Sequence, residues 1–146
     1  MPDFRFTPLD PLRFPIVTRF YKCYYPAGKP KKDEVIWTAE SNDVGLCGAV
    51  RFKQFHSFQL LTGMVITPPL RGQNLGIMFL DAVSKQTLSK PCYCLAYRSL
   101  TPLYETAGFR IIEINDLPSE LQGRYISYCN SGKDLIPMGH FPIESV

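Results

Sequence analysis

The sequence has little net charge and no long apolar run, and each absence excludes a class of protein. Sixteen Lys and Arg stand against thirteen Asp and Glu, a formal net charge of +3. A charge this small, without an Arg/Lys stripe, argues against a DNA- or RNA-binding domain. No run of about 18 apolar residues occurs, so we expect no membrane span. The first residues carry Asp3 and Asp10 and lack a signal-peptide apolar block, so we expect a cytoplasmic protein.

Metal-site and disulfide patterns are also missing. The five cysteines are an odd count and form no CxxC or Cys/His ligand spacing, so we expect no metal. Cys92 and Cys94 alternate in "PCYCLAY", which on a strand points both side chains to one face. That geometry does not suit a mutual disulfide, and it favours two small buried apolar residues.

What is present is an ordinary globular balance. Hydrophobic residues make up 45% of the chain and charged residues 20%, which excludes global disorder. A length of 146 residues suits one domain, residues 1–146, with a sizeable core.

The first half of the chain predicts mainly strands. Asp10-Pro11 begins a helix, with Asp10 as N-cap, and Pro15 confines its firm part to the residues that follow. Residues 26–34 form a proline- and lysine-rich loop. We expect a short first strand at 4–7, then an antiparallel meander of strands at 35–40, 45–52 and 58–67.

The second half alternates helices and strands. Apolar residues recur at helical spacing over 75–88. Thr101-Pro102 caps a short helix that Gly108 ends. A helix is also expected at 117–130, and strands at 91–97, 109–114 and 134–138. The whole is therefore an α/β fold.

The stretch "ITPPLRGQNLGIMFLDAV", from Ile66 to Val83, is typical of an anion site. The prolines end a strand, and a glycine-bearing turn then leads into a buried helix. Free N–H groups at the helix start, the helix dipole and the charge of Arg71 together favour phosphate. No Gly-Lys-Ser/Thr follows, so the loop is not a Walker A, and two glycines are too few for a dinucleotide-binding fingerprint.

Two motifs in this region resemble the GNAT superfamily of N-acetyltransferases. "VITPPLRGQNLG" is similar to the family's cofactor loop, with Arg71 first and Gly76 last, and departs from it at Asn74, where glycine is usual. "LYETAGF" is similar to a second signature. The resemblance implies a mixed sheet flanked by helices, with an antiparallel N-terminal meander and a splayed parallel pair at the cofactor site.

The resemblance also implies an acetyl-CoA site. Strand 60–66 would pair its edge with the pantetheine arm, and the acetyl group would lie between strands 60–66 and 93–95. Tyr97 stands where the family often has asparagine, and Ser99 or Thr101 would replace that contact. The implied cofactor-binding residues are Met64, Val65, Ile66, Arg71, Gly72, Gln73, Asn74, Leu75, Gly76, Ile77, Ser99 and Tyr104.

The catalytic groups are less completely specified. Gly63, inside an apolar strand, indicates either a bulge or a packing gap. A bulge would turn the backbone N–H of Met64 or Val65 toward the thioester carbonyl as an oxyanion donor. Tyr104 matches the family's general acid, and a buried core tyrosine is the structural alternative.

The general base has no matching carboxylate. His56, in the hairpin before strand 58–67, has a suitable reference pKa, and Glu40 is no better supported. A chain of waters that carries the proton to solvent is the default. "FYKCYY" and Trp37 would line either an aromatic acceptor cleft or the core.

The sequence thus predicts an enzyme that moves an acetyl group from acetyl-CoA to a primary amine by direct attack in a ternary complex. The alternative is a catalytically inactive module of the same fold that binds or senses acyl-CoA. The acceptor and the oligomeric state, a homodimer included, stay open.

Overall fold

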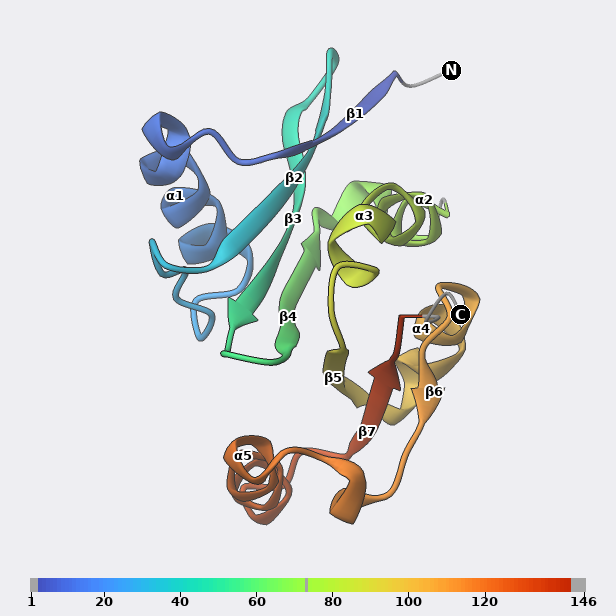
Figure 1. The fold of residues 1–146 in the computed structure, drawn as a ribbon. Coiled ribbons are helices and arrows are strands. Elements are labelled where there is room, and N and C mark those ends of the chain that lie inside the picture. Colours follow the sequence, from blue (N-terminus) through green and yellow to red (C-terminus); the bar gives the residue numbers. More distant parts are fainter. Residues whose placement is uncertain (1–2, 73, 143–146) are drawn as a thin grey trace.

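A computed structural model describes residues 3–72 and 74–142. Its strands form a seven-stranded sheet in the order β1-β2-β3-β4-β5-β7-β6. The strands are β1 (Phe4–Pro8), β2 (Val35–Ser41), β3 (Gly45–Gln54), β4 (Gln59–Ile66), β5 (Cys92–Tyr97), β6 (Arg110–Ile111) and β7 (Leu135–His140). The helices are α1 (Phe14–Tyr24), α2 (Leu75–Ala82), α3 (Ser84–Thr87), α4 (Thr101–Thr106) and α5 (Ser119–Asn130) (Figure 1).

The sheet is mixed, as the GNAT resemblance implies. The meander β2-β3-β4 is antiparallel, and β1 extends it antiparallel to β2. β4 and β5 are parallel, and their pairing runs from Gln59 opposite Cys92 to Leu61 opposite Cys94. Beyond these residues the two strands diverge (Figure 1), so the predicted splayed parallel pair is confirmed.

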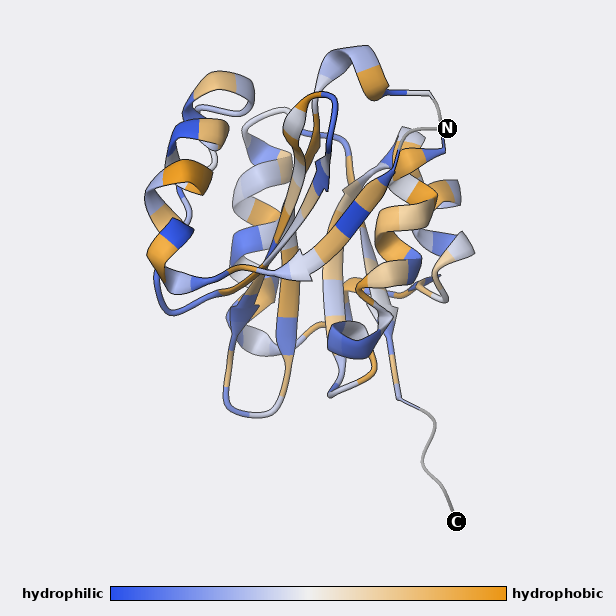
Figure 2. Cartoon of the chain, turned by 90° about the horizontal axis from the view of Figure 1, so that it is seen from above, coloured by the Kyte–Doolittle hydropathy of each residue, from blue (hydrophilic) through white to orange (hydrophobic). Residues whose placement is uncertain are grey.

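Helices cover both faces of the sheet, and apolar residues run along the strands between them (Figure 2). One face packs α1 through Val17 and Tyr21, and α5 through Leu121. The other face holds the largest buried cluster, to which α2 contributes Phe79 and α4 contributes Tyr104. β5 shows the strict alternation: Cys92 and Cys94 point into this largest cluster, while Tyr93 points toward α5. Both cysteines are free, which confirms their prediction as buried apolar residues.

Two helices of the structure differ in detail from their sequence predictions. The helix expected over 75–88 is divided at Val83, whose φ of −88° and ψ of 12° leave helical geometry. The Val83 carbonyl accepts from both Gln86 and Thr87, which tightens the chain into a 3-10-like turn without disturbing the apolar spacing. Thr101 is not the cap of α4; it lies within the helix, and its hydroxyl donates to the Arg98 carbonyl at 3.0 Å.

The strand expected at 109–114 is shorter, because a 3-10 turn, Ile114–Asp116, takes the chain away from the sheet. The Glu113 N–H donates to the Asp116 carboxylate at 3.2 Å and fixes that turn.

The Asp10 cap is confirmed. Its carboxylate accepts from the Leu12 N–H at 3.0 Å, at the start of the 3-10 turn that leads into α1.

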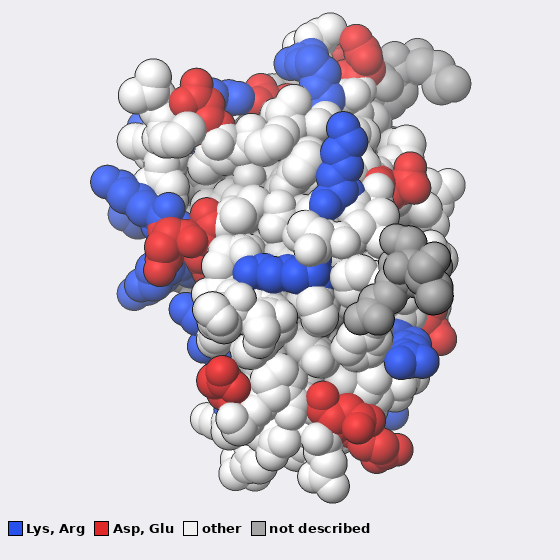
Figure 3. All heavy atoms as spheres, in the orientation of Figure 1, with Lys and Arg blue, Asp and Glu red and all other residues white. Residues whose placement is uncertain are grey.

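Charge is spread rather than gathered on the face that Figure 3 shows. On the face in Figure 3, Lys and Arg are interspersed with Asp and Glu, and neither sign forms a continuous patch. Within residues 3–72 and 74–142, no helix is long and apolar enough to cross a membrane.

β4 contains a bulge at Gly63. Ala49 is opposite Val65 and Arg51 is opposite Thr62, so the single residue Val50 stands against both Gly63 and Met64. Gly63 has a φ of +61°, the left-handed region that glycine adopts most readily. Of the two interpretations of Gly63, the structure therefore supports the bulge.

The bulge reverses which side chains of β4 face which helices. Leu61 packs into the cluster beneath α2 and α4, and strict alternation would send Val65 to the same side. Instead Met64 and Ile66 pack there, and Val65 packs against α1. The extra residue therefore delivers Met64 to the same side of the sheet as Tyr104.

Two buried side chains hold the bulge. The Tyr21 hydroxyl donates to the Gly63 carbonyl at 2.6 Å. The Arg51 guanidinium carbon lies 5.4 Å from the Tyr21 ring centroid, and Arg51 pairs with Glu34 at 3.0 Å. Arg51 also fills the space beside Gly63, because a Cβ there would lie 2.8 Å from its Nε.

Gly63→Ala is expected to destabilise the protein. The positive φ alone costs an L-residue about 1–2 kcal/mol, and the new methyl group also displaces Arg51. Urea unfolding followed by circular dichroism measures the loss. Gly123→Ala is the matched control, because Gly123 lies in α5 with open space around it, and alanine there is expected to stabilise the helix. Equal midpoints for the Gly63 variant and the wild type would contradict a strained bulge.

Candidate functional site

A cavity of about 670 Å³ passes between β4 and β5 where their pairing ends. Its walls come from residues 60–66 of β4 and residues 94–97 of β5. One end opens at the loop before α2, through Arg71, Gly72, Asn74, Gly76 and Ile77. The other end opens between α1 and α5. The splayed strands therefore form a passage from one face of the sheet to the other.

The loop end presents backbone donors. Gly72 and Asn74 have φ values of +82° and +62°, and α2 begins directly after them. The Met78 N–H donates to the Asn74 carbonyl, so the N–H groups of Gly76 and Ile77 precede the first intrahelical bond. Gln73, predicted to bind the cofactor, lies outside the described residues. Leu75 also belongs to the predicted set, but its side chain is 1% exposed in the core rather than in the cavity wall.

Arg71 lies at the same mouth. Its Nε donates to the Ile66 carbonyl at 2.9 Å, which ties the loop to the end of β4. The guanidinium is exposed and carries a full positive charge beside the N-terminus of α2. Charge and backbone donors therefore converge where the sequence predicts an anion site.

Tyr104 lines the cavity from α4, and its side chain is 6% exposed. Its hydroxyl lies 3.9 Å from the Met64 sulfur, and its ring meets Phe109 edge-on at 5.8 Å. Burial, and next the neighbouring Cys94 thiol, raise the pKa of Tyr104 well above its usual value. Burial likewise raises the pKa of Cys94 to about 12. Both groups therefore stay protonated at neutral pH.

Met64 and Val65 lie in the cavity wall immediately after the bulge. Their side chains point to opposite faces of the sheet, so their backbone lies at the passage itself. The structure thus brings together Met64, Val65, Ile66 and Tyr104 with the loop residues.

Other sequence candidates lie elsewhere. His56 is exposed in the turn between β3 and β4 and does not line the cavity. Ser99 is exposed in the 3-10 turn Arg98–Leu100, and its neighbours Tyr97 and Leu100 line the cavity instead. Glu40 pairs with Arg13, whose guanidinium lowers the pKa of that carboxyl.

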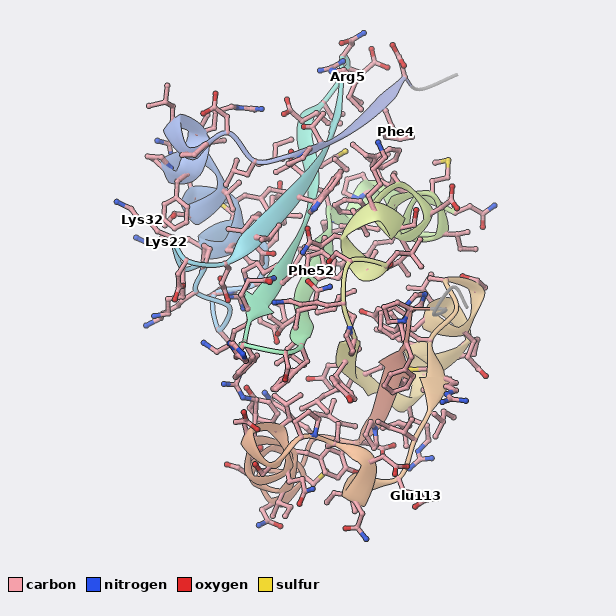
Figure 4. The ribbon with its side chains drawn as sticks, in the orientation of Figure 1. Phe4, Arg5, Lys22, Lys32, Phe52 and Glu113 are labelled. Carbon is pink, nitrogen blue, oxygen red and sulfur yellow. The ribbon has the colours of Figure 1, made fainter. Side chains whose placement is uncertain are left out.

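The lysine-rich loop after α1 points outward. Figure 4 shows Lys22 and Lys32 on the outer side of α1, away from β4 and β5. The Lys32 Nζ lies 5.9 Å from the Phe14 ring centroid, and none of the loop's lysines lines the cavity. These lysines are therefore a solvated surface.

Sequence reasoning proposed one side of the far end of the cavity, through "FYKCYY", and missed the side formed by α5 and the loop after it. Tyr24 and Tyr25, at the end of "FYKCYY", do line it, whereas Tyr21 and Trp37 are core residues. Arg124, Tyr128 and Lys133 also line it, from α5 and the loop that follows. The only signal was the spacing of Arg124 and Tyr128, which places two side chains on one helix face.

Comparison with known proteins identifies the fold. No family model and no curated protein sequence matches this chain. Solved structures do match it. N-acetylglutamate synthase from Neisseria gonorrhoeae, complexed with coenzyme A and N-acetyl-glutamate, is 12% identical, with a TM-score of 0.66 over 99% of this chain. This chain spans only 36% of that protein's length.

Two shorter proteins match over nearly their whole length. A GNAT-family acetyltransferase from Staphylococcus aureus is 16% identical, with 95% of this chain and 99% of that chain covered and a TM-score of 0.61. The ribosomal-protein-S18-alanine N-acetyltransferase from Escherichia coli is 13% identical, with 98% and 97% covered and a TM-score of 0.65. The chain therefore has the fold of the GNAT N-acetyltransferases.

The conformation of Asn74 generates a prediction. Its φ of +62° lies in the left-handed region, which asparagine tolerates better than most residues other than glycine. Asn74→Gly is expected to leave stability within about 0.5 kcal/mol of the wild type. Asn74→Val, with a branched Cβ, is expected to lose about 1–2 kcal/mol. Urea unfolding of both variants measures the difference, and equal stability of the valine variant would contradict the left-handed assignment.

Proposed function

We propose that the chain is an acetyl-CoA-dependent N-acetyltransferase that acts on a primary amine. The observation that carries the proposal is the passage between β4 and β5, which joins a basic, donor-rich loop to a buried tyrosine. The fold supports it, and the solved structure from Neisseria gonorrhoeae is described as a complex with coenzyme A.

The cavity suits acetyl-CoA chemically. A pyrophosphate needs positive charge and N–H donors, which Arg71, Gly76 and Ile77 provide. An extended pantetheine arm needs a free strand edge, which β4 offers after Leu61, where its pairing with β5 ends. Met64, Val65 and Ile66 are the residues along that edge.

Acetyl-CoA would supply the acetyl thioester, and the chain would supply positioning and a proton. The backbone N–H of Met64 or Val65 would donate to the carbonyl oxygen as negative charge builds there. The amine nitrogen would form the new bond to carbon as the carbon–sulfur bond breaks. The Tyr104 hydroxyl would then donate its proton to the departing sulfur.

The amine must also lose a proton. No carboxylate or histidine lines the cavity within the described part of the chain. We therefore assign proton removal to a chain of waters that leads to solvent.

The absence of a carboxylate or histidine from the described cavity wall also favours a second candidate, a module that binds acyl-CoA without catalysis. Thiol release in the presence of an amine separates the two.

Arg71→Glu is expected to weaken CoA binding at least tenfold, about 1.4 kcal/mol, because it places a negative charge against the pyrophosphate. Titration calorimetry with CoA measures the change, and a melting curve checks the fold. Arg19→Glu is the control, because it makes the same charge change at an exposed position on α1 outside the cavity. Equal CoA affinity for the Arg71 variant and the wild type would overturn the phosphate assignment.

Tyr104→Phe is expected to lower kcat about 10²-fold or more and to change KM little, because the proton matters mainly as charge builds on sulfur. Thiol release with any amine that the wild type acetylates measures both constants. Tyr93→Phe is the control, a buried β5 tyrosine outside the cavity. A Tyr104→Phe variant with near-normal kcat would show that Tyr104 contributes packing and not a catalytic proton. A large fall in melting temperature would show that the hydroxyl serves the core.

A further inference from the structure

The far end of the cavity has its own chemistry. Tyr24 and Tyr25 line it from the C-terminal end of α1, and Arg124 and Tyr128 line it from α5. Lys133 follows α5, and its Nζ lies 4.5 Å from the Tyr128 ring centroid. The opening is therefore a ring of tyrosines that also contains two cations.

The two cations have no acidic partner in this wall. No Asp or Glu lines the cavity within residues 3–72 and 74–142. The ion pairs within the described residues are formed by Arg13, Arg51 and Arg98, not by Arg124 or Lys133. Arg124 and Lys133 are both half-buried, so solvent screens them less than it screens a surface lysine. Their charge is available to a bound molecule.

These cations lie on the opposite side of the sheet from the phosphate loop. α5 and α1 cover one face, while the N-terminus of α2 and Arg71 serve the end of the passage at the other face. A CoA pyrophosphate at α2 leaves Arg124 and Lys133 to the second substrate, which must enter from the α1–α5 side.

We propose that the acceptor is a primary amine that also carries an anionic group, a carboxylate or a phosphate, held by Arg124 and Lys133. The fork of an arginine suits either anion. The same two charges oppose polycations, so polyamines and aminoglycosides are poor acceptors. This inference rests on the proposed acetyl transfer and deepens it.

Matched amines test the proposal directly. Thiol release is measured with L-phenylalanine against phenethylamine, L-tyrosine against tyramine, and phosphoethanolamine against ethanolamine, with spermidine as the polycation. In at least one pair the anionic member is expected to have the higher kcat/KM by about tenfold or more, which corresponds to about 1.4 kcal/mol. The carboxylate and phosphate arms show which anion is preferred. Equal rates within every pair, or a preference for spermidine, would overturn the proposal.

Variants locate the effect. Arg124→Gln with Lys133→Gln is expected to abolish the preference within the pair and to leave CoA affinity unchanged by calorimetry. Lys22→Gln, on the outer side of α1, is the control (Figure 4). A double variant that keeps the preference would contradict the assignment to these cations. One that loses CoA affinity instead would assign the two charges to the cofactor.

Binding separates failure of this inference from failure of the proposed function. If the wild-type protein does not bind CoA, the proposed function itself is wrong. If CoA binds but no amine releases thiol, the same pairs are titrated into the CoA-saturated protein. Tighter binding of the anionic members supports the acceptor class, and equal binding or none overturns it.

Discussion

The bulge at Gly63 is the constraint on which the rest of the site depends. It places two residues of β4 against one of β3 and increases the local twist of the strand. β4 pairs with β5 only before the bulge, and the strands separate from there on. Without that separation the sheet would close, and the passage between the phosphate loop and the α1–α5 opening would be filled by ladder hydrogen bonds. The bulge at Gly63 and the end of the β4–β5 pairing thus lie together at the wall of the cavity.

Side chains on the α1 face of the sheet hold the bulge, and on the other face the bulge places Met64 beside Tyr104. Tyr21 binds the Gly63 carbonyl on the α1 side, and Arg51 occupies the space that a side chain at this position would need. Because the extra residue reverses the alternation, Met64 turns toward Tyr104 on the α4 side. Burying the charges of Arg51 and Glu34 costs free energy. Their cluster with Tyr21 lies directly behind the proposed acetyl site, where it holds the bulge in place.

Local patterns predict much of this from sequence, and long-range geometry accounts for the rest. The strands follow from the pattern of apolar residues, and the loop around Arg71 follows from its glycines and the apolar helix behind it. The mixed sheet is implied by the GNAT resemblance rather than by residue pattern. The break at Val83 leaves apolar spacing intact, so periodicity does not detect it. Likewise, the cations at the α1–α5 end meet the cavity only through tertiary packing. The roles assigned to Tyr104 and the loop stay predictions, as does the single domain over residues 1–146, whereas His56 lies away from the cavity.

In the proposed complex the separated strands hold the acetyl thioester beside the backbone that follows the bulge. Amide chemical shifts of the ¹⁵N-labelled protein test this arrangement most directly, with CoA and acetyl-CoA compared at saturation. The amides of Gly76 and Ile77 are expected to shift equally with both ligands, because both ligands carry the pyrophosphate. Met64 or Val65 should differ between the two ligands, because only acetyl-CoA brings a carbonyl oxygen. If CoA and acetyl-CoA give identical shifts at Met64 and Val65, or if neither ligand shifts Gly76 and Ile77, the account is contradicted.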